Sequence, residues 1–327
     1  MKRDPFGFTR LYYTAERHGS TIRSLLGADR ALDPVAIAAH LAGAVDASRT
    51  CFSAVRSVPP SCELVDGTVR PWSPRTEPGD LGSALRAAIA RSVATAPRPM
   101  AVALSGGLDS AVVLALVKAI DPAVTALVLA PRMADYSEVD AALETARLAQ
   151  VSALVIEVTP EEFRDAVPAA IAAFEAPLYN LHPVSKWLLA EHARARGIAT
   201  VISGDGADQV FTRDVSADYL PLTSAAFATA GVALQAPFLD DDVIACVLAM
   251  PPDREKRALR ELGAGLPIPQ SLVRDRKISR LAPPLPLELP ARTLRDLAAL
   301  VGRDVPAVPD VRWETLALLV DAFEAWR

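Results

Sequence analysis

The sequence predicts an α/β fold: a doubly wound parallel sheet, with a helical C-terminal part and a small β-rich part at the N-terminus. Three observations predict it. From residue 79 onward, short apolar runs alternate with longer runs of helical composition, the pattern of a parallel sheet covered on both faces. Two of the apolar runs end in glycine-rich turns. Hydrophobic residues make up 51% of the 327 residues, enough to build two domains with sizeable cores.

Residues 1–78 form the first predicted domain, which is β-rich. Strands are predicted at residues 11–14, 62–65 and 68–70. Asp66-Gly67 lies between the last two and is typical of a hairpin turn. Asp33-Pro34 starts a predicted helix over residues 35–44, because proline suits the first helical turn.

Residues 79–327 form the second predicted domain, joined to the first by a Pro-rich linker over residues 71–79. Strands are predicted at residues 100–104, 124–130, 153–158 and 199–202. Helices are predicted at residues 83–94, 110–120, 138–150, 160–174 and 185–196. After about residue 211 the pattern shows no clear strand, so the remainder is expected to be helical.

The run over residues 104–110, Leu-Ser-Gly-Gly-Leu-Asp-Ser, is the most informative motif of the chain. It lies between a predicted strand and a predicted helix, where backbone N–H groups at the helix N-terminus hold oxyanions such as phosphate. Two glycines let the backbone approach closely, and Ser105 and Ser110 add hydroxyl donors. Asp109 would repel a bare anion, so it indicates an intervening Mg²⁺. The alternative is a glycine turn with a capping serine.

A second glycine-rich turn, Ser203-Gly-Asp-Gly-Ala-Asp-Gln209, follows the predicted strand at residues 199–202. The ligand crevice of an open parallel sheet lies outside the carboxyl ends of its strands. Asp109 and Asp208 are therefore expected to converge, and two converging carboxylates suit Mg²⁺ bound to pyrophosphate oxygens. The alternative is that these acids cap a helix and line a solvated loop.

The first motif resembles the PP-loop of the ATP pyrophosphatases, which have an adenine nucleotide α-hydrolase-like fold. Taken with the second motif, it is similar to the synthetase domain of the asparagine synthetase family. Pro237-Phe-Leu-Asp240 and the basic stretch over residues 266–277 extend the resemblance across about residues 79–290. The resemblance implies a ligase that uses ATP and Mg²⁺ to activate a carboxylate as an acyl adenylate. An amine or ammonia then attacks, and AMP and pyrophosphate are released.

The resemblance also implies roles for individual residues. Pyrophosphate would be held by Ser105, Gly106, Gly107 and Ser110. ATP would also contact Leu104, Leu129, Ser203 and Gly204. Mg²⁺ would be bound by Asp109 and Asp208, and Asp205 occupies the position of a catalytic Glu or Tyr. Lys277 matches the lysine that neutralises charge on the reacting phosphorus and on the leaving pyrophosphate.

The first 78 residues resemble the end of the family's glutaminase domain, through Arg3-Asp-Pro-Phe-Gly-Phe-Thr-Arg-Leu-Tyr-Tyr13. That domain uses a cysteine at the mature N-terminus as nucleophile, whereas this sequence starts Met1-Lys2 and its first cysteine is Cys51. Residues 1–78 are therefore expected to be a truncated glutaminase-like remnant without a nucleophile. Nitrogen is then expected from free ammonia, from a partner glutaminase or from an amine on the substrate.

The substrate is left open by the sequence. Asp205 stands where asparagine-forming members usually have Glu and lactam-forming members have Tyr, and Ala233 and Gln235 replace an E-x-R pair. These departures favour a specialised amide synthetase acting on a small-molecule or peptide carboxylate. The alternatives are asparagine synthetase proper, a lactam or lasso-type macrolactam cyclase, and an inactive family member acting as a binding subunit. A precursor-binding subunit and a second copy of the chain are the further partners to consider.

Composition argues against several other classes of protein: nucleic-acid binding, metal-binding, secreted and membrane proteins. The net charge of −5 gives no reason to expect nucleic acid or a membrane surface as partner. Cys51, Cys62 and Cys246, like the four histidines, lack the spacing of metal ligands, and free thiols in a reducing cytoplasm are the simplest account. The N-terminus is too polar for a signal peptide and the apolar runs are too short to span a bilayer, so a cytoplasmic protein is expected.

Overall fold

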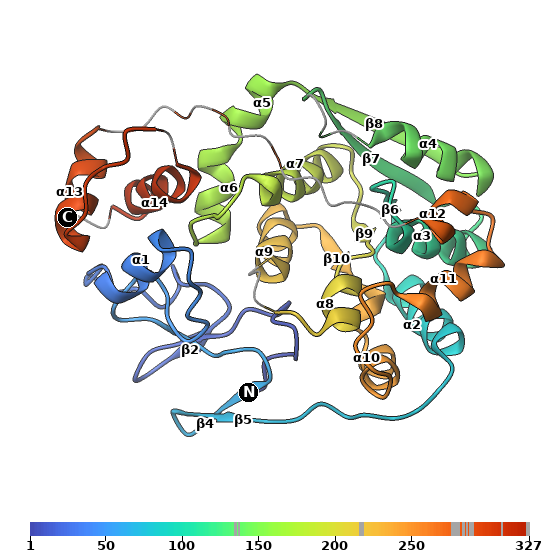
Figure 1. Cartoon of the computed structure of the whole chain (residues 1–327), viewed down its shortest axis with the longest axis horizontal. Coiled ribbons are helices and arrows are strands. Elements are labelled where there is room, and N and C mark those ends of the chain that lie inside the picture. Colours follow the sequence, from blue (N-terminus) through green and yellow to red (C-terminus); the bar gives the residue numbers. More distant parts are fainter. Residues whose placement is uncertain are drawn as a thin grey trace.

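A five-stranded parallel sheet forms the centre of the computed structural model (Figure 1). The structure describes residues 1–133, 136, 138–215, 219–275, 282, 285, 287, 291–308 and 310–324. The strands are β6 (Met100–Ala103), β7 (Thr125–Pro131), β8 (Ser152–Val158), β9 (Thr200–Ile202) and β10 (Ala233–Gln235). Their order is β10-β9-β6-β7-β8, and all neighbouring pairs are parallel. The chain runs outward in both directions from β6 and β9, so the predicted doubly wound sheet is confirmed.

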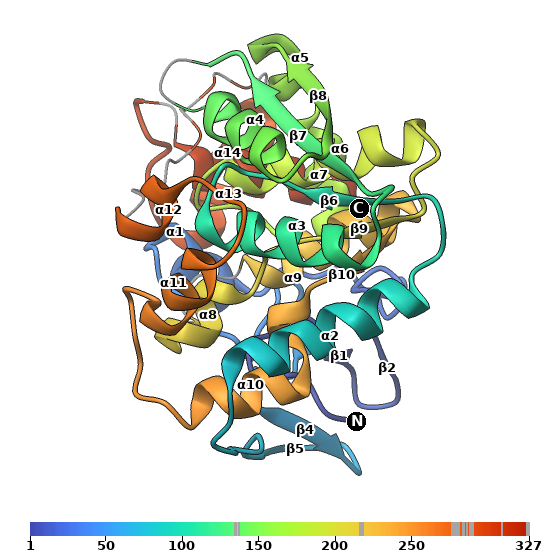
Figure 2. The ribbon, with the colours of Figure 1, turned by 90° about the vertical axis from the view of Figure 1, so that its right-hand side faces the viewer.

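Helices cover both faces of this sheet (Figure 2). The helices of this part of the chain are α2 (Leu81–Thr95), α3 (Leu108–Ile120), α4 (Val139–Leu148), α5 (Pro160–Asp165), α6 (Val167–Phe174), α7 (His182–Ala195), α8 (Ala207–Thr212), α9 (Leu220–Ala230), the 3₁₀ helix η1 (Pro237–Leu239), α10 (Asp241–Leu248), α11 (Arg257–Ala264) and α12 (Gln270–Arg274). Successive strand residues alternate between two hydrophobic clusters. Ala101 and Val201 pack with residues of α6, α7 and α9, whereas Val102 and Ile202 pack with residues of α2 and α3.

The predicted strands and helices of this domain agree with the structure, with two corrections. β10 was not expected, because three half-buried residues are too short to give a strand pattern. The helix predicted over residues 160–174 is divided into α5 and α6, and Pro168 lies in the first turn of α6. A proline there lacks the N–H of a helix interior and suits a new start, so it marks the break.

The N-terminal part contains two small antiparallel sheets and one helix. The strands are β1 (Tyr12–Tyr13), β2 (His18–Gly19), β3 (Arg56–Ser57), β4 (Cys62–Val65) and β5 (Thr68–Pro71), and the helix is α1 (Pro34–Leu41). The predicted hairpin is confirmed, since Asp66 and Gly67 both have positive φ between paired β4 and β5. Asp33 caps α1 as expected. The helix ends at Leu41 instead of residue 44, because Gly43 takes a φ of +79° that terminates it. The two-residue strands β2 and β3 were not predicted.

The N-terminal part packs against the α/β part and against the C-terminal helices α13 (Ala291–Val301) and α14 (Val311–Ala322) (Figure 1). Glu175, which follows α6 with a φ of +58°, accepts hydrogen bonds from the backbone N–H of Ile22 at 2.6 Å and of Arg23 at 3.0 Å. Its buried carboxylate also lies 3.6 Å from the guanidinium of Arg10. One hydrophobic cluster contains residues of both parts. The boundary between residues 78 and 79, and the glutaminase-like origin of residues 1–78, stay predictions.

Within the described part of the chain, no helix has the length and apolar character needed to cross a membrane.

Candidate active site

The two glycine-rich turns lie side by side at the carboxyl edge of the sheet. β6 and β9 are parallel neighbours, with Val102 opposite Ile202, so the segments that follow them leave the sheet together. The turns are in close contact, because a Cβ on Gly204 would lie 2.8 Å from the backbone nitrogen of Ser110. Only glycine fits at that position. This edge is the point where the strand order reverses, where open α/β sheets bind their ligands.

The first turn is closed by the hydroxyl of Ser110, which is buried. The backbone N–H of Ser105 donates to Ser110 Oγ at 3.2 Å, and Ser110 Oγ donates to the carbonyl of Gly107 at 3.1 Å. Gly106 has a φ of +74°, and a Cβ there would lie 2.9 Å from the carbonyl oxygen of Glu138. No described side chain caps the N-terminus of α3, which starts directly after Gly107. The turn therefore presents an uncapped helix N-terminus, the arrangement that binds phosphate.

Asp109 and Asp208, one from each turn, share a single cation. Lys256 Nζ lies 2.7 Å from Asp109 Oδ2 and 2.6 Å from Asp208 Oδ1. Lys256 directly precedes α11 and is held in a left-handed conformation with a φ of +51°. Its side chain is 11% exposed, whereas that of Asp109 is 24% and that of Asp208 is 70% exposed. The two acids expected to converge therefore do meet, around an ammonium group.

Lys256 was missed by the sequence reasoning. Burial disfavours its charged form, but the carboxylates of Asp109 and Asp208 outweigh burial, and the pKa of Lys256 is raised above its usual value. It therefore stays protonated at neutral pH. In the sequence it belongs to a charged run, Asp253-Arg-Glu-Lys-Arg257, which looks like a solvated surface segment. The run carried no signal that could separate Lys256 from its neighbours.

Asp205 belongs to a separate ion pair. Lys186 of α7 places its Nζ 2.9 Å from both carboxylate oxygens of Asp205, and the two side chains are 17% and 10% exposed. Burial disfavours the charged form of Lys186, but the carboxylate of Asp205 outweighs it and raises the pKa of Lys186. The second turn thus sends Asp208 toward Lys256 and Asp205 toward Lys186. Lys186, too, was not predicted.

The remaining residues predicted for the site differ in their burial and in what they contact. Ser203 is buried, and its backbone N–H donates to the carbonyl of Gln235 on β10 at 2.9 Å. Leu104 is buried at the end of β6, and Leu129 is half-buried in β7. Three residues of the Pro-Phe-Leu-Asp element form η1. Its Leu239 packs against Gly206, and a Cβ added to Gly206 would lie 2.5 Å from the Leu239 side chain. Lys277 lies outside the described residues.

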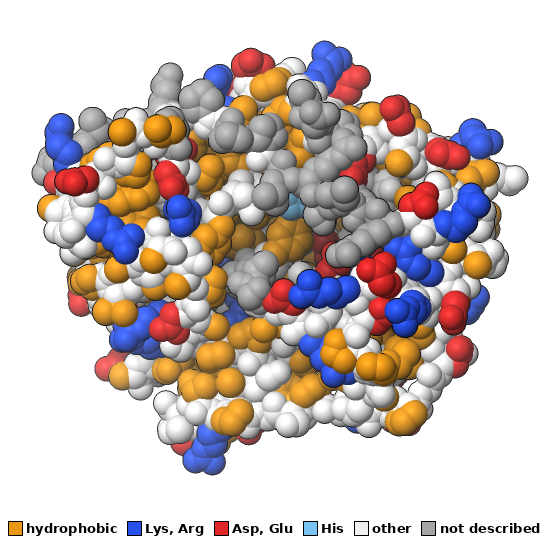
Figure 3. Space-filling model, viewed as in Figure 1, with side chains coloured by type: hydrophobic (Ala, Val, Ile, Leu, Met, Phe, Trp, Pro, Cys, Tyr) orange, Lys and Arg blue, Asp and Glu red, His pale blue; other side chains and the backbone are white. Residues whose placement is uncertain are grey.

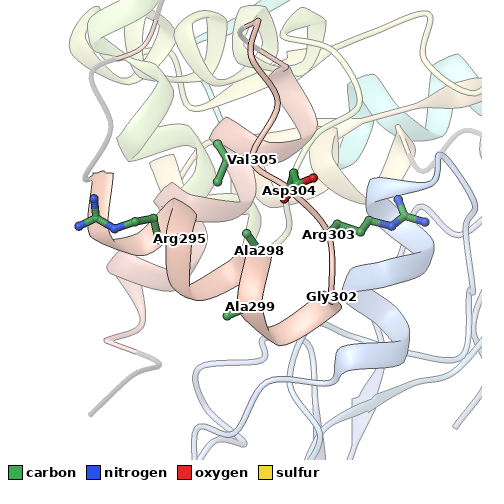
Figure 4. Close-up of a pocket in the computed structure, with 7 residues that line it drawn as sticks. All are labelled: Arg295, Ala298, Ala299, Gly302, Arg303, Asp304 and Val305. Atoms are coloured by element: carbon green, nitrogen blue, oxygen red, sulfur yellow. The ribbon is translucent and has the colours of Figure 1, made fainter.

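The surface offers a hollow near this region and a pocket elsewhere. Figure 3 shows the face of Figure 1 hollowed near its middle, with hydrophobic side chains inside and charged side chains along its lower right edge. A pocket at the end of α13 is separate from the glycine turns (Figure 4). It is lined by Arg295, Ala298, Ala299, Gly302, Arg303, Asp304 and Val305. None of these belongs to the two ion pairs described above.

Comparison with known proteins finds similarity to one family. Residues 80–213 match the family model described as asparagine synthase. The curated protein "Asparagine synthetase [glutamine-hydrolyzing] 1" of Bacillus subtilis (strain 168) is 28% identical over 233 residues, which cover 64% of this chain and 36% of that protein. The chain thus spans about a third of the length of this relative. Both glycine-rich turns lie inside the matched segment, whereas Lys256 lies beyond it.

Two solved structures are similar to the chain at low identity. The NMN synthetase from Francisella tularensis is 16% identical with a TM-score of 0.37, over 76% of this chain and 93% of that one. The NH3-dependent NAD synthetase from Campylobacter jejuni is 19% identical with a TM-score of 0.30, over 41% of this chain and 58% of that one.

Proposed function

We propose that the segment over residues 80–213, which matches the family model described as asparagine synthase, carries out ATP-dependent amide formation. In the proposed reaction a carboxylate attacks the α-phosphorus of ATP, and pyrophosphate leaves. An amine or ammonia then attacks the carbonyl carbon of the acyl adenylate, and AMP leaves. The nitrogen comes from free ammonia, from the substrate itself or from a partner. The family is one of C–N bond-forming ligases, which supports the reaction class.

One observation carries the proposal: carboxylates from both glycine turns converge on a single cation. Asp109 follows the uncapped N-terminus of α3, and Asp208 lies on the neighbouring turn. A phosphate chain bound at the helix N-terminus would bring several negative charges beside these acids. The cation between them offsets that repulsion, so the site combines an anion cradle with the means to neutralise it.

The same two acids fit a magnesium ion. Both lie within 2.7 Å of one nitrogen, so they are close enough to share a metal. Among the residues that the structure describes, no third acid, histidine or cysteine joins them to form a metal site. Mg²⁺ is commonly held by one or two carboxylates and completed by water and phosphate oxygens. Asp109 and Asp208 would hold it, and it would neutralise charge on the phosphates.

The other residues are assigned from their positions. Ser105, Gly106, Gly107 and Ser110 are proposed to bind pyrophosphate through N–H and hydroxyl donors. Once phosphates and Mg²⁺ are bound, Lys256 is proposed to move from the two carboxylates to a phosphate oxygen. Lys277 remains proposed as the charge that stabilises the transition state. Leu104, Leu129, Ser203 and Gly204 are proposed to line the nucleoside side of the site.

Pyrophosphate exchange tests the proposal. Labelled pyrophosphate should enter ATP only when a carboxylate substrate is present, so a panel of amino acids, N-acylated amino acids and short peptides is screened with Mg²⁺-ATP. Asp109→Asn should lower exchange at least about 100-fold, because the loss of one group that stabilises the charge of the transition state typically costs that much in rate. Asp140→Asn is the matched control, since Asp140 is an exposed acid in the first turn of α4.

Exchange that is equal in Asp109→Asn and in Asp140→Asn would contradict the role of Asp109. Wild-type protein that binds Mg²⁺-ATP but exchanges with no carboxylate of the panel would contradict the proposed reaction, and would favour the inactive, binding member of the family.

A further inference from the structure

A cluster of polar and aromatic side chains surrounds Asp205 and has no part in the phosphate site. It consists of Asp205, Lys186, Tyr219, His182 and Tyr136. Lys186 and His182 come from α7, Tyr219 directly precedes α9, and these two helices pack together beside β9 (Figure 1). The cluster thus lies at the end of β9, next to the turn that carries Asp208.

The contacts within the cluster are continuous. Lys186 Nζ lies 5.8 Å from the ring centroid of Tyr219, whose ring stacks on His182 at 5.5 Å. The hydroxyl of Tyr219 lies 3.5 Å from His182 Nε2, and the hydroxyl of Tyr136 lies 2.8 Å from His182 Nδ1. Burial is the main cause that raises the pKa of Tyr219 to about 12 and raises that of Tyr136, so both phenols stay neutral at neutral pH.

Lys186 fixes the position of Asp205. Both carboxylate oxygens lie 2.9 Å from the same nitrogen, which sets the rotamer of a side chain with only two rotatable bonds. A buried ion pair is a poor means of stabilising a fold, because desolvation of both charges offsets their attraction. A pair of this kind beside a ligand crevice is a candidate for function, since perturbed ionisable groups gather at active sites.

The site is therefore divided between two lysines. Lys256 holds the two acids assigned to the phosphate side, and Lys186 holds the third acid away from them. With both oxygens on Lys186, Asp205 does not share the cation of Asp109 and Asp208. It is instead a carboxylate fixed in orientation by Lys186, separate from the two acids assigned to the phosphates.

We propose that Lys186 is a positioning residue for amide formation, which holds Asp205 in the orientation in which it accepts the proton of the attacking nitrogen. This inference rests on the proposed function. In the step, the nitrogen lone pair forms the C–N bond, the bond from the carbonyl carbon to AMP oxygen breaks, and AMP leaves as an anion. The N–H proton passes to the Asp205 carboxylate. Lys186 touches neither reactant and acts through Asp205.

The test separates the two half-reactions in Lys186→Met. The acid with the highest wild-type pyrophosphate exchange is used with hydroxylamine as the nucleophile, and the hydroxamate is measured. The variant should keep Mg²⁺-ATP affinity and pyrophosphate exchange within about 3-fold of wild type. Hydroxamate formation should fall about 100-fold, which is a typical contribution of general-base catalysis to a rate. Lys118→Met is the matched control, because Lys118 is a half-buried lysine outside both ion pairs, and its ammonium donates to the carbonyl of Pro122. Lys186→Arg should recover at least about a tenth of the lost rate by restoring the charge.

The outcomes are distinguishable. Exchange and hydroxamate formation that fall together in Lys186→Met would overturn the proposal in favour of a structural role. Normal hydroxamate formation in Lys186→Met, or no recovery in Lys186→Arg, would overturn it as well. Wild-type protein that exchanges pyrophosphate with no acid would overturn the proposed function, and the role of Lys186 with it.

Discussion

Replacing Lys256 by Met tests the geometry of the phosphate site without knowledge of the substrate. The substitution keeps the length of the side chain and removes the charge between Asp109 and Asp208. Asp208 is 70% exposed, so its half of the contact contributes little. Asp109 is 24% exposed and loses a charged hydrogen bond worth about 1.5–3 kcal/mol. We expect a loss of about 2 kcal/mol in the free energy of unfolding, seen as a drop of roughly 4 °C in Tm.

Magnesium should partly reverse this loss. In the wild-type protein Mg²⁺ has to displace an ammonium from the two carboxylates, whereas in Lys256→Met the carboxylates face each other unneutralised. Millimolar Mg²⁺ should therefore raise the Tm of the variant by more than that of the wild type, because the ion binds the folded state preferentially. Differential scanning fluorimetry with and without Mg²⁺ measures both shifts, with Lys118→Met as the matched control.

The reasoning would be refuted by a Lys256→Met protein with wild-type Tm and the same small response to Mg²⁺ as Lys118→Met. A variant that lost several kcal/mol, with no recovery in Mg²⁺, would indicate that Lys256 is part of the fold and that the two acids do not form a cation site.

Three further predictions concern stability and loop packing. Burial lowers the pKa of His40 from 6.5 to about 4. As the pH falls, His40 is therefore protonated in the unfolded state before it is protonated in the folded state. Stability should therefore fall as pH drops from about 6.5 to about 4, by up to about 3 kcal/mol, and His40→Phe should flatten this slope in urea titrations. Glu175→Ala removes the carboxylate beside the buried guanidinium of Arg10 and should cost about 3 kcal/mol in the free energy of unfolding; a loss below about 1 kcal/mol would show that Glu175 does not hold the N-terminal part against the α/β part. Gly204→Ala forces a Cβ to 2.8 Å from the Ser110 nitrogen, so Mg²⁺-ATP affinity measured by calorimetry should drop at least about 10-fold; unchanged affinity would show that the turns need no close contact.

Much of the fold could be predicted because its local signals are strong. β6, β7 and β9 are apolar runs buried on both faces, and such runs between helices indicate a parallel sheet. The glycines of both turns marked where the chain leaves the sheet. The convergence of Asp109 and Asp208 could be predicted because both acids follow the carboxyl ends of strands in one parallel sheet, where the ligand crevice lies.

The two lysines could not be predicted, because their roles arise from tertiary structure. Lys186 lies within a helix and Lys256 within a charged run, and neither has a spacing that sets it apart. Each is defined by the acid it meets, 19 and 147 residues away in the sequence. Lys277, which the family resemblance singled out, lies outside the described residues. β10 escaped prediction because an edge strand of three half-buried residues has no periodicity to detect.

The position at which ATP is cleaved tests the central claim most directly. Protein, Mg²⁺-ATP, hydroxylamine and the carboxylate found by exchange are followed by phosphorus NMR. The proposed reaction predicts that AMP and pyrophosphate appear together, one of each for every hydroxamate formed. Accumulation of ADP and inorganic phosphate in step with the hydroxamate would contradict it, because the γ-phosphoryl group would then be transferred and no acyl adenylate formed.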